Sequence, residues 1–313
     1  MKAIIVRAFG GPEVLRLEEA PDPRPGPGEV LVSVKAVGVN PVEAYLRSGS
    51  YPRRPDLPFT PGTDAAGLVS AVGSGVAVLK PGQRVYVYGA KAGVYAQKAV
   101  AEVSRVFPLP DTLSFEQGAA VGVPFGTAHR ALFHHGKAKK GQTVLIHGAS
   151  GGVGTAAVQL ARAAGLTVIG TAGGPEGVAF VKALGADQAL DHRTAGYLSG
   201  LAPDLIVEML ANVNLPEDLR VCALRGRIVI VGSRGEVTID PRAAMTKDIT
   251  IQGMTLWNMP DEDRALVHAD LGRGFESGAL APVIGRSFPL AEAAKAHEAV
   301  MSPGARGKIV LIP

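Results

Sequence analysis

The stretch that decides the fold is Gly148-Ala149-Ser150-Gly151-Gly152-Val153-Gly154. It follows an apolar run, Thr143–His147, and it opens a segment rich in alanine, Gly152–Ala164, that we expect to be helical. Gly151 and Gly154 occupy the second and third glycine positions of the pattern G-x-G-x-x-G, and Ala149 stands at the first. A strand, a glycine turn and a helix in this order predict a site that binds the pyrophosphate of a dinucleotide.

A glycine-rich turn alone also fits an ordinary loop between a strand and a helix. The residues after it favour the dinucleotide site, because apolar runs alternate with helical segments, as in a parallel sheet covered on both faces. Further strands are expected at Leu166–Thr171, Gln188–Leu190, Asp204–Met209, Arg227–Val231 and Ile249–Leu256. Further helices are expected at Glu176–Leu184 and Leu215–Leu224.

The end of the second expected strand reads Gly170-Thr171-Ala172-Gly173-Gly174 and contains no acid. In sites that prefer NAD, an Asp or Glu at this place holds the ribose 2′-OH. Its absence removes repulsion of a 2′-phosphate and favours NADPH. Four basic residues are candidates for pairing with that phosphate, and each also fits a solvated surface position. They are His192, Arg193, Arg306 and Lys308.

The N-terminal part has a different texture, with short β-branched runs separated by proline and glycine. Such punctuation predicts a small β-barrel-like module. Its strands are expected at Ala3–Val6, Val30–Val39, Leu68–Val72 and Arg84–Tyr88. The segment Phe115–Leu132 is rich in small residues, as in packed helices. After residue 262 we expect a short helix, a turn at Pro282–Gly285 and a strand at Lys308–Ile312 that returns to the first module.

Composition excludes several classes of protein. The chain has 313 residues, 47% of them hydrophobic and 19% charged, which is too apolar for a disordered chain and fits two domains. The single cysteine, Cys222, excludes an intramolecular disulfide and a multi-cysteine zinc site, and we expect it in the core. The net charge of +4 comes without a dense basic run, so nucleic-acid binding is not expected. Glycines interrupt the uncharged run between Lys140 and Arg162, so we expect no membrane span and a cytoplasmic protein.

Several stretches of the chain resemble the zinc-free quinone oxidoreductases of the medium-chain dehydrogenase/reductase superfamily, especially the ζ-crystallin-like group. The resemblance spans essentially the whole chain. The matching stretches are Gly38–Tyr45, Pro61–Gly67, Gly141–Arg162, Glu208–Leu215, Val231–Gly235 and Pro282–Gly285.

The resemblance implies a Rossmann doubly wound parallel sheet inserted in a GroES-like, β-barrel-type domain. The GroES-like domain would comprise residues 1–118 and 263–313, the NADPH-binding domain residues 119–262, and the active site the cleft between them. Zinc-dependent relatives carry a Cys near the position of Asn40, a His-Glu pair near Thr63 and Asp64, and a four-Cys lobe. This chain has none of those Cys or His ligands, so activity without zinc is expected.

The resemblance also implies where NADPH would bind. The positions are Tyr45, Ser150, Gly151, Gly152, Val153, Gly173, His192, Asn214, Val231, Gly232, Ser233 and Arg234. Some relatives use a Lys in the helix after the second strand, where this chain has Gly177 and Val178. We therefore expect His192 and Lys308 to carry more of the recognition of the 2′-phosphate.

The expected reaction is NADPH-dependent reduction of a quinone. Such a site has to place the nicotinamide against a flat ring and stabilise an oxyanion. Asn40, Tyr45 and Tyr51 are the candidates for the substrate side, although Asn40 also fits a turn before proline and Tyr51 ordinary surface packing. Asp64 is expected to orient its neighbours or to pair with an arginine. An enone or enoyl reductase, and an NADPH-binding structural or RNA-binding protein, remain alternatives, and the physiological substrate stays open.

A homodimer is expected at the last strand of the nucleotide-binding sheet, Ile249–Leu256. In a six-stranded doubly wound sheet the last strand lies at an edge. This segment is apolar and β-branched, and it has neither charge nor proline. An exposed edge of this kind invites pairing with a second copy, because its N–H and C=O groups are unpaired. The alternative is an edge covered by the chain's own C-terminal segment.

Overall fold

The computed structural model describes all residues from 1 to 313. The chain forms two compact units. The outer unit comprises residues 1–123 and 268–313, and the inserted unit comprises residues 124–267. The boundaries expected from the sequence, after residues 118 and 262, lie a few residues before those of the compact units.

The inserted unit contains a parallel sheet of six strands in the order β10-β9-β8-β11-β12-β13. The strands are β8 (Thr143–Ile146), β9 (Thr167–Ala172), β10 (Gln188–Asp191), β11 (Leu205–Glu208), β12 (Arg227–Ile230) and β13 (Thr250–Gly253). The chain runs outward from β8 to β10 and then returns to place β11 beside β8. The order of the strands therefore reverses between β8 and β11, which is where doubly wound sheets bind their ligands.

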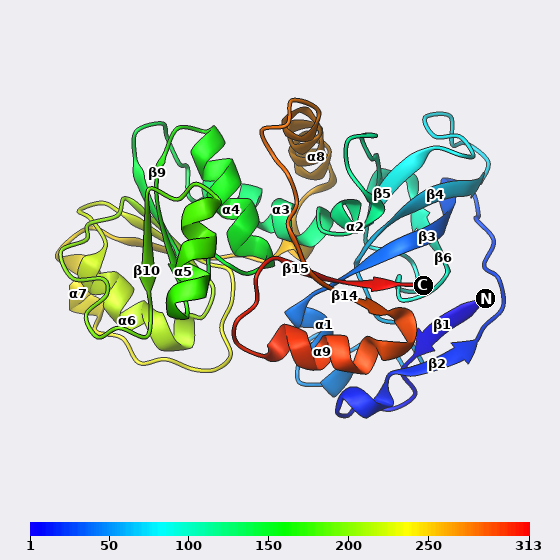
Figure 1. Ribbon diagram of the computed structural model, residues 1–313, viewed down its shortest axis with the longest axis horizontal. Coiled ribbons are helices and arrows are strands. Elements are labelled where there is room, and N and C mark those ends of the chain that lie inside the picture. Colours follow the sequence, from blue (N-terminus) through cyan, green and yellow to red (C-terminus); the bar gives the residue numbers. More distant parts are fainter. The chain divides into compact units, whose positions relative to one another are not determined.

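Helices connect these strands: α4 (Gly152–Ala163), α5 (Gly174–Ala183), α6 (Ala211–Val221) and α7 (Pro241–Met245). Figure 1 shows α4 and α5 beside β9 and β10. Leu145, Ile206 and Ile228 from the sheet share one buried cluster with Leu215 and Leu219 of α6. Crossovers between parallel strands are right-handed, so α4 and α5 cover one face of the sheet and α6 and α7 the other.

The outer unit is built on a seven-stranded sheet in the order β14-β15-β3-β4-β5-β7, with β6 paired to β3. The strands are β3 (Glu29–Val39), β4 (Asp64–Val72), β5 (Arg84–Tyr88), β6 (Lys98–Glu102), β7 (Val106–Pro108), β14 (Ile284–Pro289) and β15 (Lys308–Ile312). A separate hairpin joins β1 (Lys2–Ile5) to β2 (Arg16–Glu19). The last strand, β15, pairs antiparallel with β3, which is how the C-terminal segment returns to this unit (Figure 1). The expected fold class is thereby confirmed.

The remaining helices are α1 (Pro41–Ser48), α2 (Phe115–Gly118), α3 (Gly122–His129), a π-helical stretch (Arg130–His135), α8 (Asp261–Glu276) and α9 (Ala293–Met301). Short 3-10 turns occur at Pro12–Val14, Val103–Arg105, Leu256–Asn258 and Leu290–Glu292. No helix in the structure is both long enough and apolar enough to cross a membrane. The expected cytoplasmic location stays a prediction.

Several element bounds differ from those expected. Helix α6 begins at Ala211 rather than Leu215 and contains Pro216, a residue that usually marks a helix start. Strand β13 is shorter than the expected Ile249–Leu256, because the chain turns into a 3-10 helix at Leu256. Helices α1 and α9 were not expected, and α8 is longer than the short helix expected after residue 262. The expected position of β13 at the edge of the sheet is confirmed.

Candidate active site

The glycine turn joins β8 to α4 and has two glycines with different roles. A Cβ on Gly154 would lie 2.6 Å from the Cα of Ala149 and closer still to the carbonyl oxygen of Gly148. Only glycine therefore lets the helix pack this tightly on the turn. A Cβ on Gly151 would meet only the Gly148 oxygen, at 3.5 Å. Gly151 is the N-cap of α4, so it leaves open space beside the unpaired N–H groups at the helix start.

The residues expected to bind the cofactor in the inserted unit gather at the carboxyl end of its parallel strands. Each of them follows the carboxyl end of a parallel strand, where such sheets bind ligands. Ser150–Val153 follow β8, Gly173 follows β9, His192 follows β10, Asn214 follows β11, and Val231–Arg234 follow β12. The ends of these strands touch one another: a Cβ on Gly148 would lie 3.8 Å from the Met209 side chain, and one on Gly232 would lie 2.6 Å from the Met209 carbonyl oxygen.

His192 and Arg193 lie beside the end of β9, a strand that itself ends without an acid. A Cβ on Gly173 would lie 3.2 Å from the Nε of Arg193 and 3.2 Å from the Nε2 of His192. The Asp191 carboxylate is held by the loop itself, because it accepts the N–H groups of Gly174 and Arg193, each at 3.0 Å. These hydrogen bonds lower the pKa of Asp191. Partial burial, aided by the neighbouring Arg193, lowers the pKa of the His192 imidazole.

A buried group of three titratable side chains lies just behind the carboxyl ends of these strands. His147 follows β8, Glu208 ends β11, and Asp218 belongs to α6. The His147 Nε2 lies 2.8 Å from an Asp218 oxygen and 3.5 Å from a Glu208 oxygen. Burial raises the pKa of Glu208 to about 8 and that of Asp218 to about 7, and it lowers the pKa of His147.

In the outer unit, Asn40 has a different role from the one expected. It is 3% exposed. Its amide nitrogen donates to Glu43 at 3.2 Å and to Asp64 at 3.1 Å, and its amide oxygen accepts from Lys308. Both amide donors are therefore occupied, so Asn40 is not available to donate to a substrate. Its place in the structure is to hold the start of α1 against β4.

Lys308 likewise differs from the expectation. Its ammonium is buried and pairs with Asp64 at 3.1 Å as well as with Asn40. An expected contact of Lys308 with a 2′-phosphate finds no support in this geometry, because the charge is already neutralised. Asp64 was expected to orient its neighbours or to pair with an arginine; it accepts a hydrogen bond from Asn40, and its cationic partner is this lysine. The other Asp64 oxygen accepts the N–H of Val123 at 2.8 Å.

Glu43 extends this buried network and was not assigned from the sequence. Its carboxylate accepts the Asn40 N–H at 2.9 Å, the Thr63 N–H at 3.0 Å and the Tyr95 hydroxyl at 2.7 Å. Burial raises the pKa of Glu43. The Tyr95 hydroxyl also lies 3.0 Å from the Nε2 of His297, whose pKa burial lowers to about 3. The spacing of Asn40 and Glu43 matches a helix N-cap with an acid at the third position, a signal in the sequence that could have identified this contact.

Tyr45 and Tyr51 are both half-buried. Tyr45 lies in α1, and its carbonyl oxygen accepts the N–H of Ser50 at 3.1 Å and that of Tyr51 at 3.3 Å. The left-handed Gly49 ends the helix and allows this turn, with φ at 73°. These bonds fix the backbone of the two tyrosines relative to each other.

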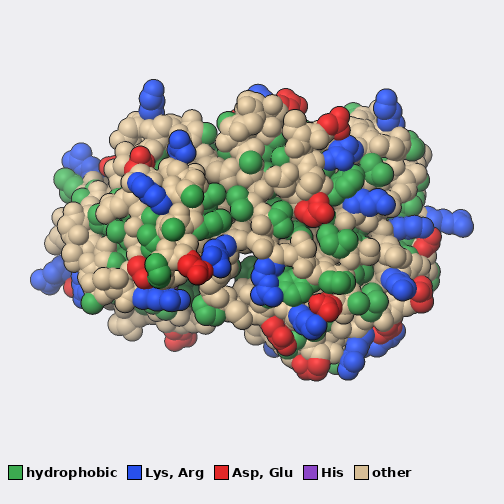
Figure 2. Space-filling model, in the orientation of Figure 1, with side chains coloured by type: hydrophobic (Ala, Val, Ile, Leu, Met, Phe, Trp, Pro, Cys, Tyr) green, Lys and Arg blue, Asp and Glu red, His purple; other side chains and the backbone are tan.

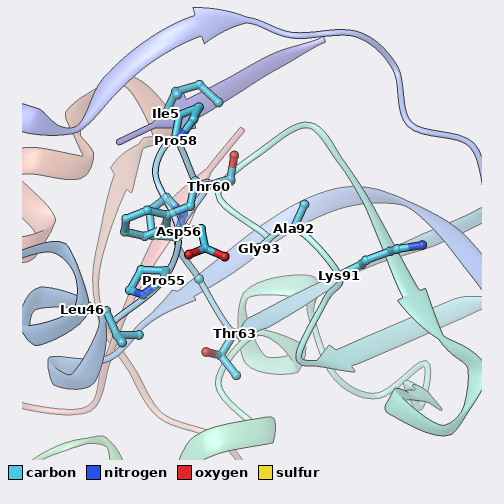
Figure 3. Close-up of a pocket in the computed structure, with 13 residues that line it drawn as sticks. Ile5, Leu46, Pro55, Asp56, Pro58, Thr60, Thr63, Lys91, Ala92 and Gly93 are labelled. Carbon is cyan, nitrogen blue, oxygen red and sulfur yellow. The ribbon is translucent and has the colours of Figure 1, made fainter. Parts of the chain in front are cut away.

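A cavity of about 530 Å³ opens in the outer unit, within the size range of small-molecule sites. Apolar residues form much of its lining, including Leu46, Pro55, Pro58 and Phe59. Figure 3 shows Asp56 and Thr60 among them, while Lys91 extends away from the other labelled side chains. The Lys91 ammonium pairs with Glu29 at 2.9 Å.

Comparisons with known proteins agree with the fold. Residues 26–111 match the family described as "Alcohol dehydrogenase GroES-like domain", and residues 152–269 match the family described as "Zinc-binding dehydrogenase". The rat (Rattus norvegicus) quinone oxidoreductase is 46% identical, with 100% of this chain and 98% of that protein covered. The quinone oxidoreductase of Lama guanicoe is 48% identical, with coverage of 100% and 97%. The crystal structure of Escherichia coli quinone oxidoreductase complexed with NADPH superposes with a TM-score of 0.92 at 30% identity, over 100% of both chains.

One matching family is described as "Zinc-binding dehydrogenase", but the residues at the positions where zinc-dependent relatives carry their ligands do not fit that metal. Zinc in proteins prefers Cys and His ligands. Here Asn40 and Asp64 are held around the Lys308 ammonium, and the only cysteine, Cys222, is buried in the inserted unit with its pKa raised to about 11. The two-unit architecture and the full-length identity to named relatives are decisive for classification: the chain belongs to the ζ-crystallin-like quinone oxidoreductases of the medium-chain dehydrogenase/reductase superfamily.

Proposed function

We propose that the protein uses NADPH to reduce a quinone. The relatives named above are quinone oxidoreductases, and one of them was solved with NADPH. The observation that carries the choice of cofactor is the end of β9, where Gly173 is flanked by His192 and Arg193. The strand itself ends without an acid, and the nearby Asp191 carboxylate is occupied by the N–H groups of Gly174 and Arg193. The Arg193 guanidinium, with the His192 imidazole as a further N–H donor beside it, favours a 2′-phosphate over a free 2′-hydroxyl.

The residues of the inserted unit fit a bound dinucleotide. The N–H groups at the start of α4 would bind the pyrophosphate, and the open space at Gly151 would admit it. Bound NADPH supplies the hydride. The reduced oxygen of a quinone resembles a phenolate, with a conjugate acid of pKa about 10, so the chain needs little acid–base machinery. We assign Tyr45 and Tyr51 to the substrate side, and Asn40 to holding α1 in place.

We place the quinone in the apolar cavity of the outer unit. Its wall of Leu46, Pro55, Pro58 and Phe59 suits a flat ring. Leu46→Trp would fill part of this cavity. We expect it to raise the KM for the quinone several-fold and to leave the Kd for NADPH unchanged. An unchanged KM would move the substrate elsewhere.

Direct binding tests the cofactor proposal. Titration by nicotinamide fluorescence should show tighter binding of NADPH than of NADH. A charge-assisted contact to phosphate contributes about 1.5–3 kcal/mol, or roughly 10- to 150-fold in affinity. His192→Ala and Arg193→Ala should each weaken NADPH more than NADH, whereas Arg242→Ala, at an exposed arginine of α7, should change neither. Equal affinity for NADH and NADPH in the wild type would refute the proposal.

A turnover screen tests the reaction. One preparation should reduce a quinone faster than a 2-enone, and turnover should survive treatment with a chelator. Faster reduction of the enone would favour the enoyl-reductase alternative, and stoichiometric zinc with chelator-sensitive turnover would refute zinc-independent chemistry. On the face drawn in Figure 2, basic and acidic side chains are interspersed, which gives no support to an RNA-binding role.

We also propose a homodimer through β13. All four residues of this edge strand are exposed in the single chain. The N–H groups of Thr250 and Met254 bond to the neighbouring strand, so alternation along the strand directs that of Ile251 outward. Ile251→Pro removes this outward donor without removing a donor to β12. We expect sedimentation to show a dimer for the wild type and a monomer for the variant; a monomeric wild type would refute the proposal.

A further inference from the structure

The buried group formed by His147, Glu208 and Asp218 lies where the strand order of the inserted sheet reverses. His147 directly precedes the glycine turn, and Glu208 is the last residue of the neighbouring strand β11. His147 is 2% exposed, and the two acids are 0% exposed. Buried titratable groups at this place adjoin the expected cofactor site without reaching its surface.

One oxygen of Glu208 fixes the beginning of α6. Its Oε1 accepts the side-chain N–H of Asn214 at 3.1 Å and the backbone N–H of Leu210. Met209, between Glu208 and Leu210 in the chain, is packed close to Gly148 of the glycine turn and to Gly232 after β12. The Glu208 carboxyl group therefore fixes the segment between β11 and α6, and that segment packs against those that follow β8 and β12.

The other oxygen of Glu208 faces Asp218 and His147, and this buried group holds a proton. Glu208 Oε2 and Asp218 Oδ2 are buried and accept no hydrogen bond. His147 is the only basic side chain paired with either acid. Two carboxylates cannot both stay ionised in such a site at low cost, so at least one proton is shared within it.

We propose that Glu208 is a positioning residue for cofactor binding: one of its oxygens orients Asn214 and the start of α6, and the other shares a proton with Asp218 and His147. The proposal rests on the proposed use of NADPH. Protonated Glu208 keeps α6 against the sheet. Loss of the proton creates a second buried negative charge that repels Asp218 and an anionic cofactor alike.

Titratable groups on several elements face the pair. His147 faces it from the end of β8, Tyr197 from the loop after β10, and Glu217 and Cys222 from α6 and its C-cap. His192 in turn faces His147. The pKa of Glu208, raised by burial to about 8, places the loss of the proton on the alkaline side of neutrality. Cofactor affinity should therefore be high at neutral pH and should fall as the pH rises through about 8.

The test measures the Kd for NADPH by fluorescence titration from about pH 7 to pH 9.5, where the 2′-phosphate does not titrate. We expect wild-type affinity to fall about tenfold, the effect of one added charge at intermediate dielectric. Glu208→Gln keeps an acceptor for Asn214 and offers an amide donor to Asp218, so its affinity should stay flat. Glu208→Ala and Asn214→Ala should bind weakly at every pH. Glu276→Gln, at an exposed acid of α8, should behave as the wild type.

Each outcome decides between distinct ideas. A Glu208→Gln variant that keeps the alkaline loss of affinity would overturn this inference while leaving NADPH binding intact. A wild type that binds no NADPH at about pH 7 would overturn the proposed function itself. Stoichiometric bound metal that disappears in Asp218→Asn would overturn the shared proton, because the cation would then neutralise the acids. If Glu208→Ala does not fold, Glu208→Gln and Asn214→Ala still decide.

Discussion

The two glycines of the turn make a prediction that separates folding from binding. Gly154→Ala adds a Cβ that would lie 2.6 Å from the Cα and 2.8 Å from the carbonyl carbon of Ala149. Carbon atoms prefer separations of about 3.5–4.0 Å, and these neighbours are backbone atoms that no rotamer change can move aside. The turn and α4 must therefore separate by about 1 Å.

The expected cost follows from two opposing terms. Overpacking costs about 1–3 kcal/mol, and a clash with backbone belongs at the upper end. The better helix propensity of alanine returns about 1 kcal/mol. We expect Gly154→Ala to lose about 2 kcal/mol, which lowers the Tm of the inserted unit by roughly 4–8 °C. NADPH binding should weaken as well, because the displaced turn no longer presents the N–H groups of the helix start.

Gly151→Ala is the matched control. The backbone of Gly151, with φ −80° and ψ 177°, suits alanine, and its Cβ would meet only the Gly148 oxygen at 3.5 Å. Its stability should equal or exceed that of the wild type by up to about 1 kcal/mol. Its affinity for NADPH should still fall, because the methyl group enters the space left for the pyrophosphate. Thermal unfolding with and without NADPH, together with fluorescence titration, measures both. Full affinity in Gly151→Ala, or wild-type stability in Gly154→Ala, would refute this account of the turn.

Three further predictions concern buried charge. The pKa values of Glu208 and Asp218 are raised in the folded chain, to about 8 and about 7, so the folded state holds protons that the unfolded state has released. The free energy of unfolding should therefore fall from about pH 5 to about pH 8. In urea unfolding, the slope of this free energy against pH should be smaller for Glu208→Gln by up to about 1.4 kcal/mol per pH unit. Lys308→Met leaves Asp64 buried without its cation and should cost about 3–5 kcal/mol in urea unfolding, and adding Asp64→Asn should recover part of that loss. Cys222 is buried with a raised pKa, so a thiol reagent at neutral pH should not modify the folded protein within the time needed to modify the urea-unfolded chain; rapid modification of the folded chain would contradict this.

The order of apolar strands and glycine turns was enough to predict the inserted sheet. A glycine turn works through local backbone geometry, so its residues are adjacent in the sequence and its function can be read there. The same holds for the acid-free end of β9 and for the edge position of β13, since strand order follows from the alternation of strands and helices.

The buried polar networks were decided only by the tertiary structure. Lys308 meets Asp64 across 244 positions of sequence and Asn40 across 268, because β15 returns to pair with β3. Nothing local to Lys308 distinguishes it from a solvated lysine, which is why its role was assigned to the cofactor. His147, Glu208 and Asp218 meet because two parallel strands and a crossover helix converge. Each residue alone reads as an ordinary strand end or helix position, and its pKa depends on neighbours that only the folded chain supplies.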